Sequence, residues 1–229
     1  MKIGVLLSGC GVFDGSEIQE AVSVLIALDE LGVEAQCLAP DMAQHHVMNH
    51  LKGEEMEPSR NVLVESARIA RGEILSLEAE SAEDLDGLVI PGGFGAAKNL
   101  CTWAFDGPDA SVQPAVAKLI VDLVKAGKPI AALCVAPVAV AKALQGSGIS
   151  ATMTLGTTEG SSPYDISGFH GGLEATGMKT RNCPLGEIAV DEANKIISSP
   201  CYMMEASPAK ILAGVRKACA KLVELAKVG

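Results

Sequence analysis

The fold is decided by the stretch Lys128-Pro129-Ile130-Ala131-Ala132-Leu133-Cys134-Val135-Ala136-Pro137-Val138-Ala139. Its apolar residues over 129–133 predict a short buried strand, and the small residues over 136–144 predict a helix with Pro137 in its first turn. Cys134 then lies in the turn from strand to helix, which is the geometry of a nucleophile elbow. The positive end of the helix favours the thiolate form. The alternative is an inert cysteine in the core.

The composition indicates a folded protein and excludes some partners. The chain has 229 residues, of which 48% are hydrophobic and 20% charged, enough for a sizeable core. A net charge of -10 without any basic run argues against binding nucleic acid or a membrane surface. The seven cysteines have no metal-binding spacing, and the chain opens directly into a strand, without a visible targeting segment. We therefore expect a cytoplasmic protein with free thiols.

Strand and helix patterns alternate along the chain. This alternation predicts an α/β protein with a doubly wound, three-layer sandwich and a mainly parallel sheet, formed by residues 1–229 as a single domain. The predicted strands span 2–8, 33–39, 74–77, 88–90 and 129–133, and a hairpin spans 187–198. The predicted helices span 16–31, 61–71, 112–126, 136–144 and 209–227. A capping box of Ser16 and Gln19 is expected to start the first helix.

Two glycine-rich loops follow predicted strands. The first spans residues 9–15 and includes Cys10, a candidate substrate-binding residue. It does not match the dinucleotide-binding GxGxxG spacing, because Asp14 stands at the third glycine position. The second loop contains Gly92 and Gly93, whose backbone N–H groups suit an oxyanion, although a simple turn is the alternative.

A histidine pair does not complete a metal site. His46 and His50 are four residues apart and could share a helix face, but no third ligand completes a metal-binding pattern. A surface or packing role is expected for both, and no metal is expected in the protein.

The segments that carry a family resemblance span 8–21, 49–51, 53–54, 60–63, 91–100, 127–129 and 190–192. They resemble the ElbB-type, or enhancing lycopene biosynthesis, proteins of the PfpI-like branch of the class I glutamine amidotransferase superfamily. The resemblance implies a flavodoxin-like sandwich, a homodimer, and Cys134 at the elbow. It also implies a glyoxalase-type activity on small aldehydes such as glyoxal and methylglyoxal, without glutathione, metal or organic cofactor.

The chain departs from the superfamily pattern at the histidines. No HxE motif is present, Val135 follows the elbow cysteine where many relatives have histidine, and Thr154 stands where others have a later histidine. His170 is the single downstream histidine and matches no motif. A glutamine amidotransferase and a complete Cys-His-acid triad are therefore not expected. The missing histidine leaves open a non-enzymatic role, as a redox sensor or partner-binding protein.

For the enzyme reading, Cys134 thiolate attacks an aldehyde carbon, and the N–H groups of Gly93 and Val135 hold the oxyanion. The resemblance implies a glutamate near the thiol, at Glu17 or Glu20. An ungapped count back from Gly32 favours Glu20, whereas the helical wheel favours Glu17, which flanks an apolar stripe of Ile18, Val22 and Leu25. We choose Glu17; the alternative is that both acids face solvent.

Overall fold

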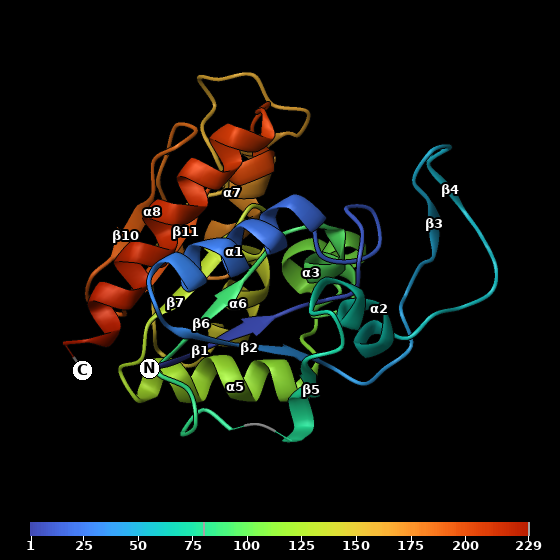
Figure 1. The fold of residues 1–229 in the computed structure, drawn as a ribbon. Helices are drawn as coiled ribbons and strands as arrows, with labels where there is room; N and C mark the ends of the chain where they lie inside the picture. Colours follow the sequence, from blue (N-terminus) through green and yellow to red (C-terminus); the bar gives the residue numbers. More distant parts are fainter. Residues whose placement is uncertain (80, 229) are drawn as a thin grey trace.

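The structure is a computed structural model that describes residues 1–79 and 81–228. These residues form one main sheet of seven strands, in the order β10-β11-β7-β6-β1-β2-β5 (Figure 1). Neighbouring strands are parallel except for the antiparallel pair β10 and β11. The strands span Lys2–Leu6 (β1), Glu34–Ala39 (β2), Ile74–Ser76 (β5), Gly87–Ile90 (β6), Ile130–Leu133 (β7), Ala189–Asp191 (β10) and Ile196–Ser199 (β11).

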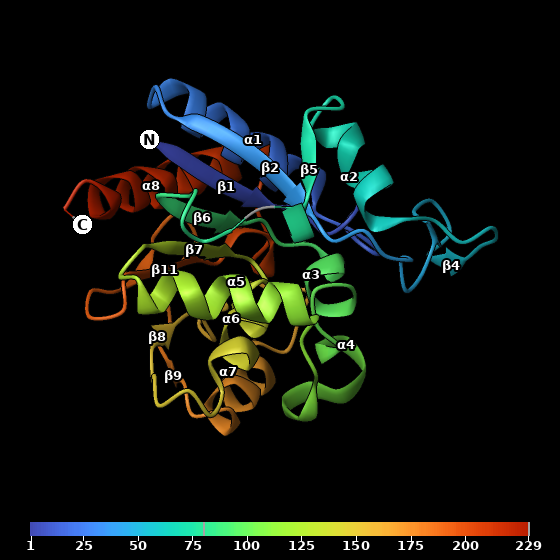
Figure 2. The same ribbon diagram turned by 90° about the horizontal axis from the view of Figure 1, so that it is seen from below.

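Helices cover both faces of this sheet (Figure 2). α1 and α8 pack against each other on one face, and α5 and α6 pack on the other. The helices span Ile18–Glu30 (α1), Val62–Ile69 (α2), Phe94–Lys98 (α3), Trp103–Asp106 (α4), Pro114–Lys125 (α5), Pro137–Leu144 (α6), Ile166–Ala175 (α7) and Pro208–Ala226 (α8). The predicted α/β class, a flavodoxin-like doubly wound three-layer sandwich, is confirmed.

Two small sheets and three short 3-10 helices lie outside this framework. β3 (Met48–Asn49) and β4 (Glu54–Glu55) form an antiparallel pair in a projecting arm, and β8 (Thr152–Met153) pairs in parallel with β9 (Lys179–Thr180) (Figure 1). The 3-10 helices in the described residues span Leu77–Ala79, Gly107–Asp109 and Cys201–Met203.

The start of α1 differs from the predicted capping box. Glu17 is the N-cap, and its side chain accepts the Glu20 N–H at 2.7 Å. Ser16 is instead one residue outside the helix, where its hydroxyl accepts the Ser8 N–H at 2.9 Å. Ser16 is drawn away from the helix because its backbone forms a bridge with Cys10, which holds it in the preceding loop.

The rotation of α1 about its axis also differs from the predicted stripe. Ile18 and Val22 are 46% and 40% exposed, so this part of the predicted apolar face does not point to the core. The buried residues of α1 are Glu20, Ala21, Ser23, Val24, Ala27 and Leu28. Packing against α8 and β2 selects this face, and it carries an acidic residue into the interior.

The loops that follow β1, β6 and β7 meet at one edge of the sheet. These strands are neighbours, and the order of connections reverses between β1 and β6, where open α/β sheets typically hold ligands. The loops carry residues 9–15, residues 91–93 and Cys134, so the predicted site segments lie at this edge.

Candidate functional site

Cys134 occupies a strained turn between β7 and α6, as the sequence predicts. Its φ angle is 56°, in the left-handed region that non-glycine residues seldom adopt. Its N–H donates to the Ser199 carbonyl at 2.9 Å, which continues the pairing of β7 with β11 by one residue. A strained backbone held by the surrounding structure is typical of functional positions.

Two backbone N–H groups point at the sulfur. Those of Gly93 and Val135 donate hydrogen bonds to the Cys134 thiol. Both residues are the ones predicted to hold an oxyanion, and an oxygen bonded to the carbon attached to sulfur would lie near the same donors. Gly93 has a φ angle of 93°, and a Cβ atom there would lie 2.3 Å from the Glu17 nitrogen, so the close approach requires glycine.

Glu20, rather than Glu17, is the carboxylate beside the thiol. Its side chain is 0% exposed and contacts the Cys134 thiol. One oxygen accepts the Gly92 N–H at 2.9 Å, and the other accepts the Tyr202 N–H at 3.1 Å. Burial raises the pKa of Glu20 to about 8, despite these two hydrogen bonds, so the carboxyl group holds a proton near neutral pH.

The choice of Glu17 is therefore wrong in its geometry. Glu17 caps α1 instead, with its carboxylate on the Glu20 N–H. The helical wheel failed because it assumed that Ile18 and Val22 face the core, whereas the polar Glu20 occupies the buried side.

The environment of the thiol also differs from the expected one. The sequence favours a thiolate, but burial, together with the negative charge of Glu20, raises the pKa of Cys134 well above its usual value. The donors at Gly93 and Val135 act in the opposite direction and do not offset this. Cys134 is 5% exposed, and it loses its proton only when a neighbouring group accepts it.

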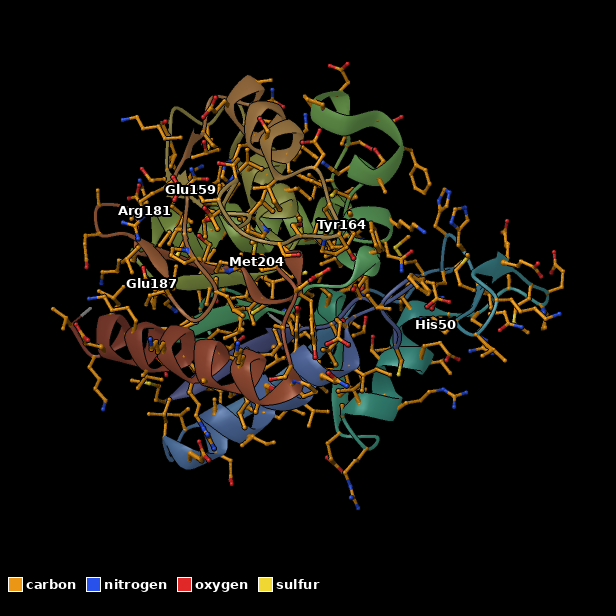
Figure 3. The ribbon with its side chains drawn as sticks, turned by 90° about the horizontal axis from the view of Figure 1, so that it is seen from above. His50, Glu159, Tyr164, Arg181, Glu187 and Met204 are labelled. Atoms are coloured by element: carbon orange, nitrogen blue, oxygen red, sulfur yellow. The ribbon has the colours of Figure 1, made fainter. Side chains whose placement is uncertain are left out.

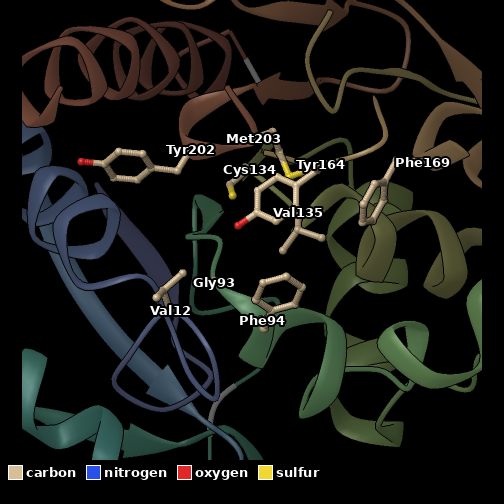
Figure 4. A pocket seen from close by; sticks show the side chains of 9 residues that line it. All are labelled: Val12, Gly93, Phe94, Cys134, Val135, Tyr164, Phe169, Tyr202 and Met203. Carbon is tan, nitrogen blue, oxygen red and sulfur yellow. The ribbon is translucent and has the colours of Figure 1, made fainter. Parts of the chain in front are cut away.

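A pocket opens above the sulfur (Figure 4). It contains about 290 Å³ of empty space, a volume that includes the open solvent at its mouth. Both tyrosines and two of the four phenylalanines of the chain take part in its wall. The lining residues are Val12, Gly93, Phe94, Cys134, Val135, Tyr164, Phe169, Tyr202 and Met203.

The aromatic wall was missed by sequence reasoning. Tyr164 and Phe169 lie in the loop before α7 and in α7 itself, far in sequence from Cys134, and no motif marks them. The sequence offers one signal for them, which is that aromatic residues make up only 3% of the chain, so each aromatic position is a candidate for a specific role.

Two other predicted site residues have different roles in the structure. Gly92 is adjacent to the thiol, but its N–H is taken by Glu20 and so is not an oxyanion donor. Cys10 does not line the pocket, because its loop faces α2, where Glu65 and Arg68 are charged neighbours of its thiol. Burial, followed by the charge of Glu65, raises the pKa of Cys10.

The histidines do not form a metal site or a triad in the described residues. His50 lies in the turn between β3 and β4, apart from Tyr164 (Figure 3), with its ring 4.9 Å from that of Phe13. His170 lies 3.4 Å from the Leu155 nitrogen, and Thr154 bonds to Gly156. No group of three or more His, Cys, Asp or Glu suited to a metal occurs in the part of the chain that the structure describes. None of the described helices has the length and apolar character needed to cross a bilayer.

A cysteine elbow at the carboxyl edge of a mainly parallel sheet agrees with the class I glutamine amidotransferase-like proteins that the sequence resembles. No protein-family model matches the sequence. The human "Glutamine amidotransferase-like class 1 domain-containing protein 3, mitochondrial" is 43% identical over 226 residues, with 98% of this chain and 83% of the human protein covered. The chain therefore belongs to the family of glutamine amidotransferase-like class 1 domain-containing proteins.

Solved structures agree with this family. An isoprenoid biosynthesis protein with an amidotransferase-like domain from Ehrlichia chaffeensis is 34% identical, with a TM-score of 0.87 over 98% of this chain and 99% of that chain. Drosophila melanogaster DJ-1beta shares the fold alone, at 16% identity and a TM-score of 0.55 over 99% of this chain and 96% of that chain.

The names of the relatives contradict the expected location. The relatives from human, rat and zebrafish are all named mitochondrial, so the expectation of a cytoplasmic protein is wrong. That expectation rested on charge, free thiols and the opening residues, and free thiols do not distinguish between reducing compartments.

Proposed function

We propose that this protein converts small dicarbonyls such as glyoxal and methylglyoxal to 2-hydroxy acids, without glutathione, by covalent catalysis at Cys134. The proposal follows the ElbB-type resemblance, which is a finer assignment than the family. The observation that carries it is the contact between the Cys134 thiol and the fully buried carboxyl group of Glu20, below a pocket lined by aromatic side chains. A homodimer also stays a prediction of this resemblance.

The first step forms a hemithioacetal. In molecules whose Glu20 is ionised, the Cys134 sulfur attacks the aldehyde carbon, the thiol proton passes to the Glu20 carboxylate, and the former carbonyl oxygen becomes an oxyanion. The N–H groups of Gly93 and Val135 already point to this place and stabilise the oxygen until Glu20 returns the proton to it, which leaves Glu20 as a carboxylate for the next step.

The second step moves hydrogen between the two carbons. Glu20 removes the proton from the carbon bonded to sulfur, giving an enediol, and the neighbouring carbon is then protonated. The product is a thioester of the 2-hydroxy acid, which one water molecule hydrolyses to release the acid and restore the thiol. The two carbons exchange oxidation states internally, so the reaction needs no external oxidant or reductant.

The pKa of Glu20 suits this shuttle. A value of about 8 lies close to neutral pH, where the group can both accept and return a proton.

The test is turnover of glyoxal to glycolate by protein purified from a host that lacks its own glyoxalases, without glutathione or added metal. We expect slow turnover by the native protein and none by Cys134→Ser. Undiminished turnover in Cys134→Ser would overturn the mechanism. Selective oxidation of Cys134 by mild peroxide, with no turnover of any dicarbonyl, would support the sensor instead.

A further inference from the structure

Tyr164 presents a hydroxyl group to the site that the proposed steps do not use. Figure 4 shows this hydroxyl directed into the pocket on the side of Cys134. Burial raises the pKa of Tyr164, and the charges of Cys134 and Glu20 raise it further, so the phenol stays protonated and is a donor. Among the described residues, no hydrogen-bond partner of this hydroxyl is found, so it is free to bind a ligand.

The position of Tyr164 is fixed by its neighbours. Its N–H donates to the Ser162 hydroxyl at 3.0 Å, and this hydroxyl donates to the Met203 carbonyl at 2.6 Å. The Tyr164 ring packs edge-on against Phe94, with 5.9 Å between ring centroids. The backbone at Tyr164 is therefore held, through Ser162, by the segment that follows β11, and Met203 of this segment also lines the pocket.

The second tyrosine of the pocket has no free hydroxyl. Tyr202 points away from the pocket toward α1 in Figure 4, where its hydroxyl bonds to the Gln19 side chain. The pocket wall carries no cationic side chain, and the remaining side chains other than the thiol are apolar. Among the described residues that line the pocket, Tyr164 is thus the one whose side-chain hydroxyl has no partner.

We propose that the Tyr164 hydroxyl holds the second oxygen of the substrate, which makes the site specific for dicarbonyls over simple aldehydes. This inference rests on the proposed function and assigns its substrate class. Gly93 and Val135 serve the oxygen on the carbon that the sulfur attacks, whereas Tyr164 donates to the oxygen on the neighbouring carbon. Negative charge develops on that oxygen as the enediol forms, so the hydrogen bond strengthens there. No bond of the phenol breaks.

The test compares methylglyoxal with propionaldehyde, which has three carbons but one oxygen. Each aldehyde protects Cys134 from iodoacetamide by reversible addition, and peptide mass spectrometry measures the concentration that halves alkylation. In Tyr164→Phe, we expect that concentration to rise roughly 2- to 10-fold for methylglyoxal, as for the loss of one hydrogen bond to a neutral carbonyl oxygen. For propionaldehyde we expect no change, and turnover of methylglyoxal should fall by a larger factor, because the oxygen becomes charged as the enediol forms.

Ser150→Ala is the control, because it removes an exposed hydroxyl that bonds to the Gly177 carbonyl outside the pocket, and it should keep protection by both aldehydes. Unchanged protection by methylglyoxal in Tyr164→Phe, or an equal loss for both aldehydes, would overturn the inference. The proposed function is tested separately by the turnover of the native protein. If methylglyoxal protects Cys134 in a Tyr164-dependent way but no hydroxy acid forms, the dicarbonyl site stands and the proposed reaction falls.

Discussion

Two glutamates three residues apart at the start of α1 have different partners. The Glu20 carboxyl group contacts the thiol, while Glu17 caps the helix. We expect Glu20→Gln to abolish glyoxal turnover, because an amide cannot accept the proton from carbon. Glu17→Gln should retain most of it, since an amide oxygen can still accept the Glu20 N–H. Initial rates of both variants measure this, and near-native turnover in Glu20→Gln would contradict the assignment.

The charge of Glu20 also controls when the thiol ionises. Glu20 is a negative neighbour that raises the pKa of Cys134, so its removal should lower that pKa. In the native protein the iodoacetamide rate should rise with pH through and beyond about 8, where Glu20 loses its proton. In Glu20→Gln the whole profile should shift to lower pH. A shift to higher pH would show that the Glu20 charge does not act on the sulfur.

At this scale the sequence predicted Cys134, Gly93 and Val135 in their observed places. It could not decide between Glu17 and Glu20. The decision depends on how α1 is rotated against α8 and β2, and two exposed aliphatic residues, Ile18 and Val22, misled the helical wheel.

The loop after β6 fits the elbow so closely that one added carbon disturbs it. A Cβ atom on Gly92 would lie 2.3 Å from the Cys134 Cβ and 2.7 Å from a Glu20 oxygen. We expect Gly92→Ala to push the thiol and the carboxyl group apart, lower turnover at least tenfold and destabilise the fold by about 1–3 kcal/mol.

Gly171→Ala is the matched control, because a Cβ atom on Gly171, in α7, meets nothing within 4 Å. It should keep both turnover and stability, which thermal unfolding beside the glyoxal assay would show. If the two variants behave alike, the close contact at Gly92 has no consequence for the site.

Elements with strong patterns were predictable to within two residues or so, including β7, α6 and α8. The cap of α1 was not, because Ser16 is a preferred capping residue in sequence and the observed cap, Glu17, is not. Glu17 is the cap because the bridge between Cys10 and Ser16, a contact outside the helix, holds Ser16 in the preceding loop.

At the scale of the whole molecule, the buried Glu20 makes stability depend on pH. Its pKa is raised from 4.5 to about 8, so the folded protein binds more protons than the unfolded chain between these values. The contribution of Glu20 therefore favours folding below about pH 4.5 and is lost as the pH rises to about 8. The loss is at most about 5 kcal/mol.

Glu20→Gln removes this term, because an amide does not titrate. Urea unfolding of both proteins between pH 5 and 8 should show the variant gaining stability relative to the native protein as the pH increases. A constant difference across this range would mean that Glu20 titrates normally.

The predicted homodimer is tested by light scattering on the native protein, whose measured mass is compared with the 23.6 kDa of one chain.

The layered fold was predictable from the alternation of strands and helices, whereas the aromatic wall of the pocket was not. Tyr164 and Tyr202 come to line the pocket above the thiol through long-range folding of the segments after α6, and no local pattern encodes such an arrangement.

The partners of Glu20 have a consequence for how the chain matures. Its carboxyl group joins α1 to Gly92 and to Tyr202, which lies 182 residues later. β11, which pairs with β7 below the elbow, also comes from the last part of the chain. During synthesis, Cys134 therefore leaves the ribosome long before the segments that enclose it, and its thiol becomes buried only when the C-terminal strand and α8 are added. A nascent chain stalled before β11 should expose Cys134 to alkylating reagents, so the burial of this thiol marks completion of the sheet.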